Sequence, residues 1–326
     1  MPKLIDVHHH IVPKEYVGSL AKKGISKGLG VPLPRWDVKK MLEVMDKNGI
    51  SVSVVSISAP GVYFKDKDPD MQLAKDLSRQ MNETSAKLIS EYPKRFGAFA
   101  TLPLPDVEAA IKELDYAYNE LKLDGVTLLS NYDGYYLGDP KFDALFSELN
   151  EKKAVVFIHP ASPPGVENSH FGLPEAMIDV CFDTTRTAFS LVMNGVIKKY
   201  QNIRIILAHA GGSVPFMASH PGLFYAAPGN QAEKMIAELE PEGLEFFLKK
   251  FYFDTALSAS PHALSTLSAF ADHSRIVFGT DYVFAGKPAV PITVKGLNDY
   301  HGFNEKDRHA IEFENAQQLF PRLKSV

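Results

Sequence analysis

Residues 4–10, Leu-Ile-Asp-Val-His-His-His, join a short apolar run to three consecutive histidines. The apolar residues predict a buried strand. Because side chains alternate between the two faces of a strand, we expect His8 and His10 on one face and His9 on the other. Two imidazoles at this spacing can bind one borderline metal ion such as zinc. Taken alone, the pair indicates either a metal site or an ordinary polar surface.

Seven further apolar runs follow the first at intervals along the chain. Most are continuously hydrophobic rather than alternating, which is typical of parallel strands covered on both faces. Amphipathic helical patterns, for example over 36–47 and 107–121, lie between them and predict repeated β–α–β units. The eight predicted strands are Leu4–His10, Val52–Ser58, Phe96–Thr101, Gly125–Leu129, Ala154–His159, Ile203–His209, Phe251–Ala256 and Ile276–Asp281.

The connections between these segments are asymmetric. Helix-to-strand links such as 47–49 and 151–153 are short, whereas strand-to-helix links such as 59–69 and 160–173 are long. Barrel enzymes hold their chemistry in long loops at one end of a parallel sheet. We therefore predict an α/β fold, a (β/α)8 TIM barrel. A doubly wound open sheet is the alternative, but no glycine-rich phosphate turn follows the first strand.

The whole chain, residues 1–326, is predicted to form a single domain. Residues 11–35, rich in Gly and Pro, indicate an insertion after strand 1, and residues 290–299 and 305–320 indicate extra C-terminal helices. Asn304 is the expected N-cap of the last helix. No linker-like or low-complexity segment separates a second domain.

Composition limits the partners and the compartment. A net charge of −4 gives no electrostatic reason to expect nucleic acid or an anionic membrane as a partner. The single cysteine, Cys181, excludes an internal disulfide framework and is typical of a reducing compartment, so we expect a cytoplasmic protein. No apolar run is long enough for a signal peptide or a membrane span.

Side chains that bind metals or transfer protons recur at the ends of the predicted strands: His8 and His10 in the first, then His159, His209 and Asp281. In a barrel these ends surround one mouth. A lone strand histidine is usually a hydrogen-bonded core residue. Several buried histidines and an aspartate without partners would be costly, however, and one shared divalent cation satisfies them all.

Four motifs in this order resemble the amidohydrolase superfamily: DVHHHIVP at 6–13, FIHP at 157–160, HAGG at 209–212 and FGTD at 278–281. More narrowly, the chain resembles the decarboxylase-rich branch that includes aminocarboxymuconate semialdehyde, γ-resorcylate and 6-methylsalicylate decarboxylases. The segments WDVKKMLEVMDKNGI and ENAQQLFP extend the resemblance over nearly the whole chain.

The resemblance implies a role for each residue. Its implied metal ligands are His8, His10, His159 and Asp281. His209 is implied as the acid–base residue beside the metal, with Asp281 as a second catalytic group. Binuclear relatives bridge two metals through a carboxylated lysine at the fourth strand, but residues 125–130, GVTLLS, contain no lysine. One divalent metal follows, with zinc favoured and manganese as an alternative.

The same residues serve two kinds of reaction. In decarboxylation, the substrate carboxylate and a neighbouring oxygen bind the metal, and Asp281 or His209 protonates the carbon that loses CO2. In hydrolysis of a lactone or other ester-like or C–N bond, a metal-activated water attacks and Asp281 takes the proton. The resemblance favours a non-oxidative decarboxylase of a small aromatic or enoic carboxylic acid. A non-catalytic metal-binding protein is the third possibility.

Four further residues are candidates for substrate binding: Arg35, Ser58, Asn131 and Tyr282. Arg35 is equally consistent with a solvated surface residue, and Asn131 with a turn. Relatives of this branch imply a homodimer. Some of them place an arginine from the neighbouring subunit eleven residues after the HAGG histidine, but here that position is His220. A less acidic substrate than the muconate semialdehyde is therefore expected.

Overall fold

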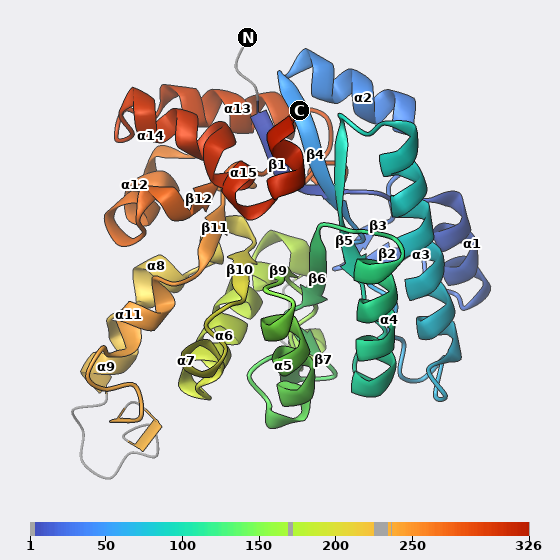
Figure 1. The fold of residues 1–326 in the computed structure, drawn as a ribbon, viewed down its shortest axis with the longest axis horizontal. Coiled ribbons are helices and arrows are strands. Elements are labelled where there is room, and N and C mark those ends of the chain that lie inside the picture. Colours follow the sequence, from blue (N-terminus) through green and yellow to red (C-terminus); the bar gives the residue numbers. More distant parts are fainter. Residues whose placement is uncertain (1–3, 169–171, 225–233, 236, 326) are drawn as a thin grey trace.

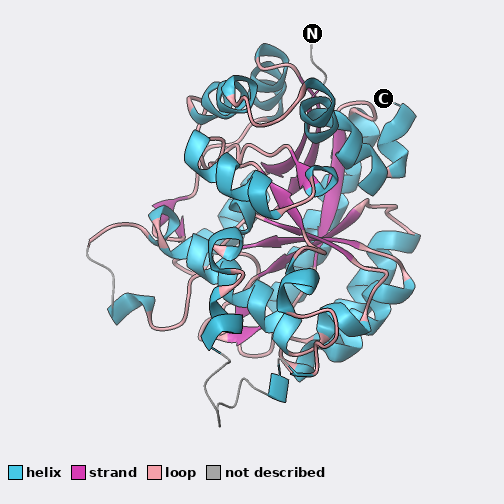
Figure 2. Cartoon of the chain, turned by 90° about the vertical axis from the view of Figure 1, so that its left-hand side faces the viewer, coloured by secondary structure: helices cyan, strands magenta, loops and turns pink. Residues whose placement is uncertain are grey.

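The protein is described by a computed structural model that covers residues 4–168, 172–224, 234–235 and 237–325. Eight parallel strands form one sheet whose spatial order follows the chain. Figure 2 shows the strands in the middle of the molecule with helices around them. The strands are β1 (Leu4–His10), β4 (Ile50–Ser56), β5 (Phe96–Thr101), β6 (Gly125–Leu129), β9 (Val155–His159), β10 (Arg204–Leu207), β11 (Tyr252–Asp254) and β12 (Ile276–Val277).

Hydrogen bonds between β1 and the segment that follows β12 join the two ends of the sheet. The Val7 N–H donates to the Phe278 carbonyl at 3.0 Å, and the Asp281 N–H donates to the His8 carbonyl at 2.8 Å. The sheet is thereby nearly closed into a barrel, which confirms the predicted (β/α)8 fold over the doubly wound alternative. The last strand, Ile276–Val277, is shorter than the predicted Ile276–Asp281, and the backbone at Asp281 (φ 58°) is not extended.

Helices cover the outside of the barrel (Figure 1). Helix α2 illustrates why they form: Asp37 caps it by accepting from the Lys40 N–H, and Met41 and Met45 lie on its buried stripe. The α-helices are α1 (Lys14–Lys22), α2 (Val38–Lys47), α3 (Gln72–Glu91), α4 (Val107–Asn119), α5 (Asp143–Glu151), α6 (Asp179–Met193), α7 (Val196–Lys199), α8 (Val214–Met217), α9 (His220–Phe224), α11 (Leu244–Leu248), α12 (Pro261–Phe270), α13 (Ala289–Asp299), α14 (Glu305–His309) and α15 (Asn315–Leu319).

The insertion after β1 contains helix α1 and a two-stranded antiparallel ribbon, β2 (Lys27–Gly28) and β3 (Val31–Pro32). Gly28 packs directly on the loop after β4, because a Cβ at this position would lie 2.4 Å from the Ala59 carbonyl oxygen. A second ribbon, β7 (Asn131–Tyr132) and β8 (Tyr135–Tyr136), follows β6. Both ribbons therefore belong to the long strand-to-helix loops.

The C-terminal segment closes the end of the barrel where the strands begin, opposite the long strand-to-helix loops. Phe320 is 1% exposed and meets the ring of Phe99 edge to face at 5.6 Å between centroids. Burial of such a ring contributes about 1.5–3 kcal/mol. Arg322 pairs with Asp124, which directly precedes β6, at 2.8 Å. The predicted N-cap is confirmed, since the Asn304 side chain accepts from the Asp307 N–H at 2.8 Å.

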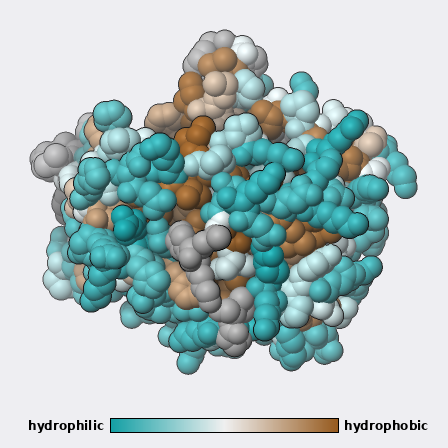
Figure 3. Space-filling view, turned by 90° about the horizontal axis from the view of Figure 1, so that it is seen from above, coloured by the Kyte–Doolittle hydropathy of each residue, from teal (hydrophilic) through white to brown (hydrophobic). Residues whose placement is uncertain are grey.

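The face of the molecule in Figure 3 is largely hydrophilic, with apolar side chains in separate patches. Within the described ranges, no helix combines the length and the apolar character that a membrane span requires.

Candidate metal centre and active site

Three histidines and one aspartate converge at the carboxyl ends of the strands. His8 and His10 come from β1, His159 ends β9, and Asp281 follows β12. All four side chains are buried, and one ligand atom from each lies within 4.8 Å of the others. The Nε2 atoms of His8 and His10 are 3.0 Å apart. Asp281 Oδ1 lies 3.4 Å from His8 Nε2 and 3.1 Å from His10 Nε2.

The donor set fits a single divalent metal ion. Zinc–nitrogen bonds of about 2.0–2.1 Å place the ligand atoms of a tetrahedral site about 3.3 Å apart. The ligand atoms of His8, His10 and Asp281 lie 3.0–3.4 Å apart, which is close to this spacing. Asp281 Oδ1 is buried and receives no well-directed hydrogen bond within the described part of the chain. This acceptor and the imidazole nitrogens therefore share a need for a cation.

The outer nitrogen of each ligand histidine already has a partner. These contacts are His8 Nδ1 to Asp254 Oδ2 at 2.7 Å, His10 Nδ1 to Ser56 Oγ at 3.1 Å and His159 Nδ1 to the Pro160 carbonyl at 2.9 Å. These contacts fix the ring orientations, and the carboxylate and the carbonyl keep the protons of His8 and His159 on Nδ1, which leaves Nε2 available to a metal.

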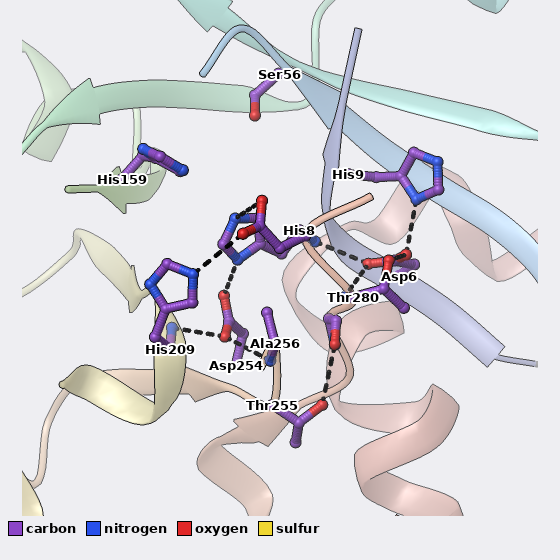
Figure 4. A network of polar contacts seen from close by, with 12 residues as sticks. Asp6, His8, His9, Ser56, His159, His209, Asp254, Thr255, Ala256 and Thr280 are labelled. Atoms are coloured by element: carbon purple, nitrogen blue, oxygen red, sulfur yellow. Dashed lines mark hydrogen bonds and ion pairs between the residues drawn. The ribbon is translucent and has the colours of Figure 1, made fainter. Parts of the chain in front are cut away.

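Asp254 was missed by the sequence reasoning and is fully buried at the end of β11. Besides its contact with His8, its Oδ1 accepts from the His209 N–H at 2.8 Å and from the Ala256 N–H at 2.9 Å (Figure 4). It connects one metal ligand to the turn that carries His209. A lone carboxylate inside the apolar run 251–256 was the available sequence signal.

Asp6 forms a second buried network behind the site. His9 points away from the other histidines, as the strand alternation predicted, and its Nδ1 lies 2.7 Å from Asp6 Oδ2 (Figure 4). Asp6 also accepts from the backbone N–H and the hydroxyl of Thr280 at 3.1 and 2.5 Å. This network fixes the segment that carries Asp281 against β1.

His209 lies beside the four-residue cluster. Its Nε2 is 3.4 Å from Asp281 Oδ2, and its ring centroid is 5.1 Å from that of His8. Its Nδ1 is buried without a hydrogen-bond partner in the described structure. The turn is tight beneath it, because a Cβ on Gly212 (φ 63°) would lie 2.0 Å from the Cys181 carbonyl oxygen.

The electrostatics of the cluster call for positive charge. Burial opposes protonation of His8, but Asp254 and Asp281 outweigh it and raise the pKa of His8 to about 10. Burial and the neighbouring histidines lower the pKa of His159. Burial alone would raise the pKa of Asp281, but the adjacent His8 charge and hydrogen bonds from the surrounding histidines hold it well below its usual range. The ion pairs of Asp254 and Asp281 in the described structure are all with histidines.

A cavity of about 100 Å³, the inner cavity, opens in front of these residues. Its polar groups come from Ser58, His159, His209 and Asp281, and the Ser58 hydroxyl lies 3.3 Å from His159 Nε2. The remaining lining residues are Gly28, Leu29, Val31, Ala59, Ala176, Val180, Leu257, Phe284 and Ala285. The space next to the metal ligands is therefore mostly apolar.

The other candidate substrate residues lie outside the inner cavity. Arg35 is exposed and is not one of its lining residues. Tyr282 is 3% exposed and packs on His9, with ring centroids 4.9 Å apart. Asn131 lines a neighbouring pocket and donates to Asp183 at 2.9 Å. Their roles in substrate binding stay predictions.

A nearly closed barrel with three histidines and a carboxylate at its mouth defines a (β/α)8 protein with a metal site. The chain belongs to the amidohydrolase family, whose model, described as "Amidohydrolase", matches residues 5–322. The resemblance seen in the sequence is thus confirmed.

Named relatives of this chain include decarboxylases. A 6-methylsalicylic acid decarboxylase of Penicillium expansum is 33% identical over 99% of this chain and 97% of its own length. A crystal structure of an amidohydrolase II has a TM-score of 0.87 and 27% identity and covers 97% of this chain and 99% of its own. A dihydroxybenzoic acid decarboxylase of Polaromonas, crystallised with bound manganese and the inhibitor 2-nitroresorcinol, shares the fold at a TM-score of 0.81 and 22% identity, covering 98% of this chain and 97% of its own.

Proposed function

We propose that this protein is a metal-dependent, non-oxidative decarboxylase of a small aromatic carboxylic acid of the hydroxybenzoate type. The observation that carries the proposal is the position of His209, a proton-transferring side chain beside the metal-ligand cluster and on the wall of the inner cavity. The near full-length similarity to a 6-methylsalicylic acid decarboxylase supports it.

In this proposal, His8, His10, His159 and Asp281 hold the metal. When bound, the ion supplies positive charge for the substrate carboxylate and an adjacent oxygen. His209 supplies the proton: as the C–C bond breaks, the electron pair stays on the ring carbon and takes this proton, and CO2 leaves. Asp281 Oδ2, 3.4 Å from His209 Nε2, orients the imidazole.

The lining of the inner cavity suits an aromatic ring. Leu29, Val31 and Phe284 supply apolar surface, which excludes water from the developing negative charge. Among the described residues that line it, histidine is the only type with a basic side chain. The substrate carboxylate therefore depends on the metal for its neutralisation, and acids with one carboxylate are favoured.

The identity of the metal is part of the proposal. Three imidazoles and one carboxylate favour zinc, and manganese is the alternative because the Polaromonas structure carries it. Elemental analysis of purified protein, together with reconstitution of the metal-free protein by each ion, decides between them. Full activity of the metal-free protein, with no gain from either ion, would remove the metal from the proposal.

We also propose that residues 1–326 form one domain that acts as a homodimer in the cytoplasm. The exposed Phe216 (84%) and Ile292 (68%) support an interface between subunits, and the single Cys181 supports a reducing compartment. Light scattering after gel filtration tests the dimer, and imaging of a tagged protein tests the compartment.

The deciding experiment measures CO2 release from a panel of hydroxybenzoates, with lactones assayed in parallel. Release of CO2 from at least one acid, dependent on metal, is the expected result. Lactone turnover without CO2 release from any acid would favour the hydrolase alternative, which uses the same residues. Metal binding without either activity would favour a non-catalytic protein.

A further inference from the structure

The inner cavity has a larger neighbour, the outer pocket. The outer pocket holds about 330 Å³ and lies between the β2–β3 ribbon and the loops after β4, β6 and β9. Small-molecule sites typically measure about 300–1,000 Å³, so the inner cavity of about 100 Å³ falls short by itself, whereas the outer pocket reaches this range. Its lining residues are Lys27, Gly28, Leu29, Gly30, Ala59, Pro60, Tyr63, Leu129, Asn131, Tyr132, Asp133, Ala161, Ser162 and Glu175.

The partition between the two spaces consists of Gly28, Leu29 and Ala59, which line both. Gly28 packs against the Ala59 carbonyl, so position 28 admits no side chain without a shift of the chain. Leu29 is the only long side chain of the partition. The Leu29 backbone is fixed by the loop after β9, because the Ala176 N–H donates to the Leu29 carbonyl at 3.1 Å. Leu29 is therefore the side chain of the partition that a substitution can shorten.

The outer pocket offers polar groups to a ligand. The Tyr63 hydroxyl and the Lys27 ammonium form no hydrogen bond or ion pair with other described residues. The acidic groups of the same lining are engaged, since Asp133 pairs with Lys65 and Glu175 accepts from Ser162. A ligand that ends in an oxygen acceptor can receive hydrogen bonds from both free donors.

We propose that the inner cavity and the outer pocket are two subsites of one binding site, joined past Leu29. The preferred acid carries on its ring a flexible side chain that ends in a hydroxyl or carbonyl oxygen. The ring and carboxylate occupy the inner cavity, and the side chain reaches Tyr63 and Lys27. The inference rests on the proposed function and narrows its substrate class.

Binding to non-reactive analogues tests the two subsites. The probes are 2-nitrophenols, in which the nitro group replaces the carboxylate, bearing at position 3 hydrogen, methyl, pentyl or 5-hydroxypentyl. Calorimetric titration of the metal-loaded protein should show at least tenfold tighter binding of the 5-hydroxypentyl probe than of 2-nitrophenol. Tyr63→Phe and Lys27→Met should each weaken binding of the 5-hydroxypentyl probe severalfold and leave the affinity for the pentyl probe unchanged. The matched control Lys39→Met, an exposed lysine outside both linings, should change neither.

Leu29→Gly tests the partition and should fold, because Leu29 has a positive φ of 51° that glycine adopts without strain. It should tighten binding of a fifth probe, 2-nitrophenol with a branched isopentyl group at position 3, at least tenfold and leave the binding of 2-nitrophenol itself unchanged. Equal affinities across the probe series, unaffected by the three variants, would overturn the subsite inference while metal-dependent binding of 2-nitrophenol left the proposed function intact. Failure of every probe to bind, with no CO2 release from any acid, would instead refute the proposed function.

Discussion

Asp254→Asn tests how much the orientation of His8 contributes to metal binding, because it changes a contact of His8 and leaves all four metal-ligand residues in place. Asp254 accepts three hydrogen bonds: two on Oδ1 from backbone N–H groups at 2.8 and 2.9 Å, and one on Oδ2 from His8 Nδ1 at 2.7 Å. The carboxamide of asparagine keeps only one acceptor oxygen. Because two N–H groups need Oδ1, that oxygen stays with them, and the NH2 group faces His8 Nδ1.

Two donors cannot face each other, so His8 must move its proton from Nδ1 to Nε2. That is the atom 3.0 Å from His10 Nε2, in the centre of the ligand cluster. Loss of such an outer contact lowers metal affinity about 10–100-fold, or about 1.4–2.8 kcal/mol. Competition with a calibrated chelator, followed by elemental analysis, measures the change in the metal dissociation constant.

Asp183→Asn is the matched control. Asp183 is equally buried and accepts from Asn131 at 2.9 Å and Tyr136 at 2.7 Å, as well as from Ser130. None of these donors is a metal ligand, so the control should lose stability but keep metal affinity. A folded Asp254→Asn protein with the affinity of the unaltered protein would refute the tautomer argument.

Three further predictions follow from the same site. His209→Ala should abolish turnover while elemental analysis still finds about one metal per chain; loss of the metal would mean that His209 is a ligand. Because the pKa of His8 is raised from 6.5 to about 10, its stabilisation of the metal-free protein is complete below pH 6.5 and disappears as the pH rises through about 10. The melting temperature should fall over that window, and metal affinity at neutral pH should rise with pH because binding displaces the proton; a pH-independent affinity contradicts this. Asp6→Ala leaves the buried donors of His9 and Thr280 without an acceptor and should cost about 3–5 kcal/mol in urea unfolding, whereas a change below about 1 kcal/mol would contradict the role of the Asp6 network in fixing the Asp281 segment against β1.

The barrel was predictable because its strands carry a local signal. Each strand is a short apolar run, and the sequence placed His8, His10, His159 and Asp281 at the ends that a closed parallel sheet brings together. The convergence of these four side chains then follows from the fold, however far apart they lie in the sequence.

Asp254 and the partition at Leu29 were not predictable from local patterns. Asp254 meets His8 from 246 residues away, and its side chain gives no sign in the sequence of which donors it will accept. Leu29 stands in a Gly-rich stretch whose conformation depends on contacts with Ala59 and Ala176 from other loops. Loop geometry of this kind is a tertiary property, which propensities do not encode.

The backbone at the site connects the fold to its chemistry. His209, Ala210 and Asp281 adopt φ values of 55°, 55° and 58°, in the left-handed region that non-glycine residues avoid. Such strain costs about 1–3 kcal/mol per residue and persists only where the surroundings over-determine the conformation. Two buried carboxylates fix these conformations. Asp254 accepts from the His209 N–H, and Asp6 accepts from the N–H of Thr280, which directly precedes Asp281. The acid–base candidate and the carboxylate of the metal-ligand cluster are thus each held in position by a buried aspartate that does not itself line the cavity.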